Sequence, residues 1–205
     1  TDSAFAAVKG DGSVVTWGDA DFGGNCDAVR EQLAANVLHV YSAAYAFAAV
    51  KGDGSVVTWG DADAGGNCDA VREQLAADVQ HVYSTYKAFA AVKGNGSVVT
   101  WGDAEHGGNC NAVQEQLAAD VHQIYSTQCA FAAVKGDGSM VTWGNAGYGD
   151  NSDAVQEQLA ADVQHIYSTG RTLGGGGAFA AVKGDGSVVT WGNPGYGGNS
   201  DAVRE

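Results

Sequence analysis

A unit of about 42 residues recurs five times along this chain, almost letter for letter. Its anchor, Ala-Phe-Ala-Ala-Val, begins at residues 4, 46, 88, 130 and 178, so the spacings are 42, 42, 42 and 48 residues. A unit this small cannot bury a core alone, so neighbouring copies must cover each other's apolar faces. We therefore expect one repeat domain spanning residues 1–205. Its first two copies differ at six positions: 22/64, 36/78, 38/80, 43/85, 44/86 and 45/87.

The copy at residues 79–120 illustrates the secondary structure expected of each unit. Residues 79–84 form a β-branched and aromatic run that is typical of a strand. Residues 88–92 are apolar throughout, as in a strand covered on both faces. Gly-Asn-Gly at 94–96, which is Gly-Asp-Gly in the other copies, indicates a hairpin turn before the returning run 97–101. Each unit is thus predicted to contain a three-stranded antiparallel meander.

Two segments leave alternatives open. Residues 111–119 fit either a two-turn helix or an outer strand followed by a helical turn. The linker at 169–177 is six residues longer than its counterparts and ends in four glycines, which indicates a flexible excursion. We expect a solvated loop there; the alternative is a segment ordered by a partner through Arg171 and Leu173.

The ends of the chain do not coincide with the ends of a repeat. The sequence begins at Thr1 and stops at Glu205, in the middle of a copy, so we expect a mature form or a fragment. Unless chain beyond the given sequence supplies it, the unit at residues 4–18 is expected to lack the first strand of its meander.

The charge balance narrows the classes of partner. Ten Lys and Arg stand against 24 Asp and Glu, giving a net charge of −14. This acidity argues against nucleic-acid binding through a basic face and against anionic membrane surfaces. No apolar run approaches the roughly 20 residues of a transmembrane helix. We therefore expect protein partners, no nucleic acid, and no transmembrane segment within the chain.

The cysteines are expected to be free thiols. Three occupy one repeat position that is serine in the other two copies, and the fourth lies in a linker. Equivalent positions of neighbouring units lie beyond the roughly 7 Å Cα separation that a disulfide allows. No Cys/His pair has zinc spacing. Free thiols favour a reducing compartment, although the compartment stays unidentified. The residues are Cys26, Cys68, Cys110 and Cys129, with Ser152 and Ser200 as the serine counterparts.

The loops after each Trp-Gly carry oxygen-bearing side chains at alternate positions, as calcium loops do. The second acid is lost at Gly147 and Gly195, and the closing bidentate Glu of an EF-hand is absent. Asx turns, in which these oxygens accept backbone N–H groups, explain the same pattern. We predict no metal site. The residues concerned are Asp19, Asp21, Asn25, Asp27, Asp61, Asp63, Asn67, Asp69, Asp103, Glu105, Asn109 and Asn111.

Catalytic chemistry is not indicated, because an active site needs different residues in one place and this chain repeats the same ones. No Ser/His/Asp order, no Cys/His pair and no phosphate-binding glycine loop recurs. We predict a non-enzyme with no catalytic residue and no cofactor. The histidines, expected on strands or in loops as packed or surface residues, are His39, His81, His165, His122 and His106.

The run Ala-Phe-Ala-Ala-Val-Lys-Gly-Asp-Gly-Ser-Val-Val-Thr-Trp-Gly, followed by Asp-x-x-x-Gly-Gly, resembles the RCC1-type (regulator of chromosome condensation-like) propeller repeat. Residues 143–149 and 191–197 match the Trp-Gly-Asn…Tyr-Gly loop of that family best. The resemblance implies an all-β propeller of five blades around a channel. A five-fold α/β propeller is the architectural alternative. The tryptophans, one per copy, are expected to serve packing: Trp17, Trp59, Trp101, Trp143 and Trp191.

The function expected from these features is a non-enzymatic protein–protein interaction module, or an accessory structural subunit of a larger assembly. One alternative is a calcium-stabilised ligand- or carbohydrate-binding propeller. Another is a regulator or enzyme with a divergent site in the channel. Nucleotide exchange and chromatin binding, known in the resembled family, depend on loops and basic tails that this sequence does not show.

Overall fold

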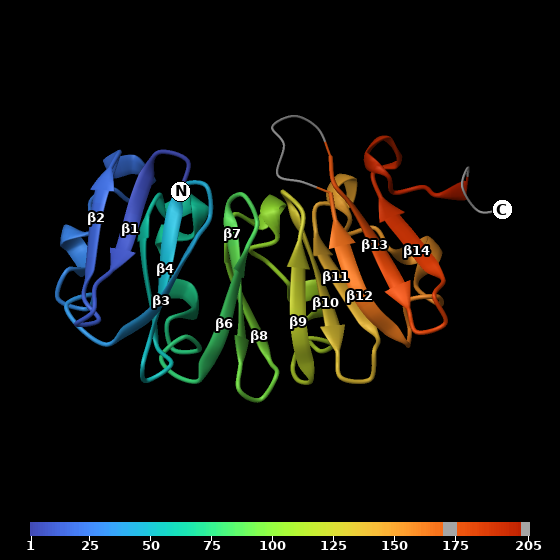
Figure 1. Ribbon diagram of the computed structural model, residues 1–205, viewed down its shortest axis with the longest axis horizontal. Helices are drawn as coiled ribbons and strands as arrows, with labels where there is room; N and C mark the ends of the chain where they lie inside the picture. The colour runs from blue at the N-terminus through green and yellow to red at the C-terminus, as the bar shows by residue number, and fades with distance from the viewer. Residues whose placement is uncertain (170–175, 202–205) are drawn as a thin grey trace.

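The structure, a computed structural model, describes residues 1–169 and 176–201. In those residues the fold is all-β: five antiparallel sheets stand side by side in a row (Figure 1). Four sheets have three strands in meander order, and the first sheet has two. The predicted meander is confirmed, as is the two-stranded first unit. Each sheet is one blade.

The strands follow the repeat closely. Blade 1 holds β1 (Ala4–Val8) and β2 (Val14–Gly18). The first, central and last strands of blades 2 to 5 are, in order, β3 (Val37–Ser42), β4 (Ala46–Lys51) and β5 (Val56–Gly60); β6 (Val79–Ser84), β7 (Ala88–Lys93) and β8 (Val98–Gly102); β9 (Val121–Ser126), β10 (Ala130–Lys135) and β11 (Met140–Gly144); β12 (Val163–Ser168), β13 (Ala178–Lys183) and β14 (Val188–Gly192).

Short helical turns join the blades, and the described residues contain no α-helix. The five-fold α/β propeller is therefore not the architecture. Residues 111–119, for which the sequence left helix and strand open, begin with a single helical turn and continue as turns up to Leu117. The Leu117 side chain is buried, and its carbonyl oxygen accepts the Val98 N–H at 2.9 Å. The turns are η1 (Ala20–Phe22), η2 (Asp27–Val29), η3 (Ala62–Gly66), η4 (Asp69–Val71), η5 (Ala104–His106), η6 (Asn111–Val113), η7 (Ala146–Tyr148), η8 (Asp153–Val155) and η9 (Pro194–Tyr196).

The central strand of each blade explains the apolar anchor. In β7, Ala90 and Ala91 point to opposite faces of the sheet, and neither is accessible to solvent. Small side chains on both faces let the neighbouring blades approach closely. The turn after β7 is the expected hairpin, with Gly96 at φ +76° and its N–H donating to Lys93 O at 2.9 Å.

An aromatic pair packs each blade against the blade before it. Phe89 and Trp101 are cross-strand partners, and their rings stack at 5.2 Å. Phe89 lies against Gly65 of the preceding blade, where an added Cβ would come within 2.7 Å of the ring. Trp101 Nε1 donates to Gly65 O at 3.0 Å. The same contact recurs at every junction, through the pairs Trp59 and Gly23, Trp143 and Gly107, and Trp191 and Gly149.

The row of blades is open. Figure 1 places β1 and β2 at one end and β14 at the other, with the remaining blades between them. The first strands of neighbouring blades contact each other, β3 with β6, β6 with β9, and β9 with β12. They therefore form the side of the row on which the blades converge. Arg171 and Leu173, which the sequence singled out in the linker 169–177, lie outside the described residues.

Candidate functional site

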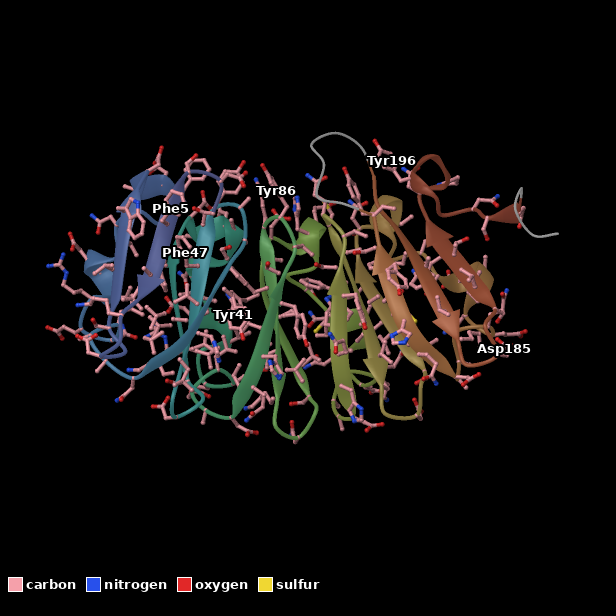
Figure 2. The ribbon with its side chains drawn as sticks, in the orientation of Figure 1. Phe5, Tyr41, Phe47, Tyr86, Asp185 and Tyr196 are labelled. Atoms are coloured by element: carbon pink, nitrogen blue, oxygen red, sulfur yellow. The ribbon has the colours of Figure 1, made fainter. Side chains whose placement is uncertain are left out.

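One edge of the row is built from the linkers that lead into the central strands. Their backbones are hydrogen-bonded in series at a spacing of 42 residues. The Asp2 N–H donates to Ala44 O, the Ala44 N–H to Tyr86 O, and the Tyr86 N–H to Gln128 O, each at 2.9 Å. Figure 2 shows Tyr86 at this edge. Since each link fixes the next, the edge is a pre-organised surface rather than a set of independent loops.

Aromatic side chains gather on this edge over the first three blades. Phe22, in η1, lies 4.7 Å from the Tyr45 ring, measured between centroids. Tyr45 meets Tyr86 edge to face at 5.4 Å, and their hydroxyls are 3.0 Å apart. Tyr86 in turn lies 6.2 Å from the His106 ring. All four side chains are half-buried, so one side of each remains accessible.

Charged groups surround these rings. Lys87 Nζ lies 5.2 Å from the centroid of the Tyr45 ring, within the range of a cation–π interaction. His106 Nδ1 is 2.8 Å from Asp103 Oδ1, and the same carboxylate oxygen accepts the His106 backbone N–H at 3.1 Å. Burial acts to raise the pKa of Asp103, but the hydrogen bond and charge of His106 outweigh it, so this pKa lies below its ordinary value. We call this group the aromatic rim patch: Phe22, Tyr45, Tyr86, Lys87 and His106.

The hydroxyl pair at the centre of the patch has perturbed acidity. The hydrogen bond with Tyr45, together with partial burial and the nearby Asp2 carboxylate, raises the pKa of Tyr86 to about 12. Tyr86 Oη donates to Asp2 Oδ2 at 3.4 Å. The phenol therefore stays protonated at neutral pH and serves as a hydrogen-bonding group rather than as a base.

The sequence contains a signal for this patch that motif searching misses. Four of the six positions at which the first two copies differ, 22/64, 43/85, 44/86 and 45/87, lie in or beside the patch. Ala64 stands where Phe22 is, and the third linker carries Gln128 at the position of Tyr86 and Cys129 at the position of Tyr45. The divergence between the first two copies therefore concentrates on this edge, and the combination of Phe22, Tyr45 and Tyr86 occurs once along the chain.

The loops with alternating oxygen side chains use those oxygens on their own backbone. Asp19 Oδ1 accepts the Asp21 N–H at 2.9 Å, and Asn25 Oδ1 accepts the Asp27 N–H at 2.7 Å. The later copies repeat the second contact through Asn67 and Asn109. Within the described residues, no group of three or more His, Cys, Asp or Glu side chains is arranged to hold a metal ion.

The histidines of the first strands are not assembled into a site. His39, His81 and His165 are exposed at one register position on successive blades, opposite Val50, Val92 and Val182 of their central strands. His122 is also exposed, and its Nε2 lies 3.6 Å from Asp120. Only His106 joins a cluster of side chains, in the aromatic rim patch.

A groove of about 830 Å³ lies between the loops of blades 2 and 3. Carboxylates, amides and the thiols of Cys68 and Cys110 line it, together with Thr100 and Trp101, but no histidine or lysine does. The groove therefore has no imidazole or amine beside its thiols, and the basic groups in its lining are carboxylates. All four cysteines are free thiols, as predicted. Burial, with the charges of Asp103 and Glu105, raises the pKa of Cys129 to about 11.

Comparison with known proteins identifies the fold class. No family model matches the chain, and no curated protein sequence matches it either. Among solved structures, Prp20p from Saccharomyces cerevisiae, studied with its binding to Gsp1p and histones, aligns at a TM-score of 0.55 and 14% identity over 93% of this chain and 55% of its own. Yeast RCC1 (Prp20) with bound Kap60 aligns at 0.55 and 14%, over 93% and 54%.

Human WBSCR16 aligns at a TM-score of 0.53 and 17% identity, over 93% of this chain and 59% of that protein. The chain thus spans under two thirds of the length of these structures. At these identities the likeness establishes the fold alone: the chain has the β-propeller fold of RCC1 type, and it contributes five blades. No helix among the described residues has the length and apolar character needed to cross a membrane.

Proposed function

We propose that this protein is a protein-interaction module that contacts its partner through the aromatic rim patch. The observation that carries the proposal is the Tyr45–Tyr86 pair, held edge to face with its hydroxyls 3.0 Å apart at the edge where the first two copies diverge. Tyrosine supplies a large, rigid contact area with a polar end, which is why it is enriched at the energetic centres of interfaces.

The surroundings of the pair support the same proposal. The serial hydrogen bonds of the linkers, from Asp2 to Gln128, hold the patch in place before any partner binds, which lowers the entropy lost on association. Lys87 places one cation among rings in a protein of net charge −14. A partner with an acidic or hydrogen-bonding group beside an apolar one fits this chemistry. The propeller neighbours include proteins studied with protein partners.

The finer role follows from what the repeats share. A group that all five copies share is presented five times, so it gives no unique site, and no histidine or lysine lines the groove between blades 2 and 3. We therefore propose a non-enzymatic accessory subunit that contributes a rigid surface to a larger assembly.

The test compares matched variants in one capture experiment. The wild-type protein and Tyr45→Ala/Tyr86→Ala are used as baits in native extract of the source organism, and retained proteins are identified and then purified. Leu38→Gln is the control, because Leu38 is exposed at the opposite end of its strand and the second copy carries Gln80 there. We expect the purified partner to bind the wild type and Leu38→Gln equally, and the double variant at least tenfold more weakly.

Two outcomes count against the proposal. If the purified partner binds all three baits with equal affinity, its contact lies outside the aromatic rim patch. If the protein turns over a substrate and the double variant keeps that activity, the proposed non-enzymatic role is wrong.

A further inference from the structure

The hairpin turn of blade 3 differs from its four counterparts in one side chain. Residues 94–96 are Gly-Asn-Gly, whereas the other blades carry Gly-Asp-Gly at this position, and Asn95-Gly96 is the one Asn-Gly pair in the chain. Asparagine is a thermolabile residue, and a following glycine favours loss of its side-chain ammonia, because no Cβ hinders ring closure at the glycine nitrogen. The turn of blade 3 therefore carries a reactive group that the other hairpins lack.

The structure leaves this pair open to water. Asn95 is exposed in the turn between β7 and β8, and Gly96 beside it is half-buried. Both residues line a cavity of about 350 Å³ together with Lys93. Figure 2 shows Asp185, the equivalent of Asn95 in blade 5, at the edge opposite Tyr86. Water and hydroxide therefore reach the Asn95 amide in the folded protein, on the edge opposite the aromatic rim patch.

The turn also holds the amide against the nitrogen that attacks it. Asn95 Oδ1 accepts the Ser97 N–H at 2.9 Å, so the side chain folds over the intervening Gly96 nitrogen. The same hydrogen bond polarises the amide carbonyl, which makes its carbon a better electrophile. The opposing restraint is the hydrogen bond from the Gly96 N–H to Lys93 O at 2.9 Å. Hydrogen bonds at exposed turns open at little cost in free energy, so this one delays the reaction without preventing it.

We propose that Asn95 is a site of spontaneous deamidation, which gives the third hairpin the charge of its counterparts. The Gly96 nitrogen bonds to Asn95 Cγ, and the side-chain amine leaves as ammonia with the proton that the Gly96 nitrogen gives up. The product is a five-membered succinimide. Water then adds to one ring carbonyl: opening at the side-chain carbonyl gives aspartate, and opening at the main-chain carbonyl gives isoaspartate. The balance is one water consumed and one ammonia released, with no oxidation or reduction.

The other blades show how the aspartate product is accommodated. Asp53 Oδ1 accepts both the Ser55 N–H at 3.0 Å and the Ser55 hydroxyl at 2.6 Å. Among the described residues, Asn95 accepts only the backbone contact of this kind. Gly54 and Gly96 share a φ of +76°, so an aspartate fits the third turn without rearrangement and gains the hydroxyl contact. Isoaspartate adds a carbon to the main chain of the turn, so we expect that product to distort the hairpin.

The test follows deamidation at each asparagine of the folded chain. The purified protein is incubated at neutral and at mildly alkaline pH and then digested, and mass spectrometry measures the deamidated fraction of each peptide. Asn67 and Asn109 are internal controls, because their side chains accept the N–H two residues on at 2.7 and 2.9 Å but cysteine follows each of them. We expect Asn95 to react roughly tenfold faster than either control, or more, since only its neighbour lacks a Cβ. A protein isoaspartyl methyltransferase detects the isoaspartate product.

Two variants complete the test. Asp53→Asn places an Asn-Gly pair in the matching turn of blade 2, and should add a second reactive site there. Asn95→Asp should abolish the mass change at its own turn and elute on anion exchange with the deamidated wild type, which has one negative charge more than −14. A rate at Asn95 no faster than at Asn67 overturns the proposal. So does a reaction that begins only after the protein is unfolded in urea, because the folded hairpin would then protect the pair.

Discussion

The indole nitrogen of Trp101 donates a 3.0 Å hydrogen bond to the carbonyl oxygen of Gly65, a residue of the preceding blade 36 positions earlier in the chain. Both groups are buried, and the bond crosses the interface between two sheets that share no backbone ladder. A polar contact of fixed direction thus sets the position of one blade on the next, while the apolar packing around it supplies most of the free energy.

Trp101→Phe should destabilise the protein by about 1–3 kcal/mol, because the Gly65 carbonyl loses its donor in a place that water does not reach. Urea unfolding, followed by circular dichroism, measures the change in midpoint. Trp17→Phe is the matched control: its indole is half exposed and bonds to no described residue, so we expect a change within about 0.5 kcal/mol. Similar losses in the two variants would mean that aromatic packing, and not the hydrogen bond, carries the effect.

The blades themselves were predictable from sequence, whereas the contacts between them were not. The apolar anchor and the Gly-Asp-Gly turn are local signals, and the strands β7 and β8 lie where these signals place them. The fit of Phe89 against Gly65 depends on how one blade sits on the next, which no local pattern specifies. The aromatic rim patch escaped motif reasoning for a similar reason: Phe22 lies in the turn after blade 1 and Tyr45 in the linker of blade 2, and they meet only in three dimensions.

Gly107→Ala separates steric fit from backbone strain. Gly107 has φ +92°, and the added methyl would lie 2.7 Å from Phe131 Cδ2. Gly197 has φ +95° with nothing within 4 Å, so Gly197→Ala bears only the left-handed backbone cost of about 1–2 kcal/mol. We expect Gly107→Ala to lose a further 1–3 kcal/mol or so through overpacking, read as the difference between the two unfolding midpoints. Equal losses would show that Phe131 moves aside without cost.

The aspartates of the Gly-Asp-Gly hairpin turns should make the stability of the protein depend on pH. Hydrogen bonds from the serine hydroxyl two residues on, and then from its backbone N–H, lower the pKa of Asp53 from 3.8, and Asp11, Asp137 and Asp185 behave alike. A depressed folded-state pKa contributes stability above pH 3.8 that is lost as the pH falls through the folded value. The third copy already carries Asn95, which accepts the Ser97 N–H at 2.9 Å without a titrating group.

Replacing all four aspartates with asparagine should therefore flatten the decline of the unfolding midpoint below pH 3.8, relative to the wild type. Measurements of that midpoint from neutral to acidic pH in both proteins give the comparison. Curves that run parallel down to the lowest pH would place the acid sensitivity elsewhere among the 24 carboxylates.

The four thiols should react with a disulfide reagent in order of their accessibility and acidity. Cys26 and Cys68 are half-buried in the loops of blades 1 and 2, while Cys110 and Cys129 are buried. Burial raises the pKa of Cys129 to about 11, so at mildly alkaline pH little thiolate forms there, and the thiolate is the nucleophile. We expect a fast phase from Cys26 and Cys68 that disappears in Cys26→Ser/Cys68→Ser, and a slow phase in which Cys129 is last. Serine is the matched replacement, because Ser152 and Ser200 hold the same position in blades 4 and 5. Rapid modification of Cys129 in the folded protein would show that the third linker opens far more often than its hydrogen bond to the second linker, from the Tyr86 N–H to Gln128 O, allows.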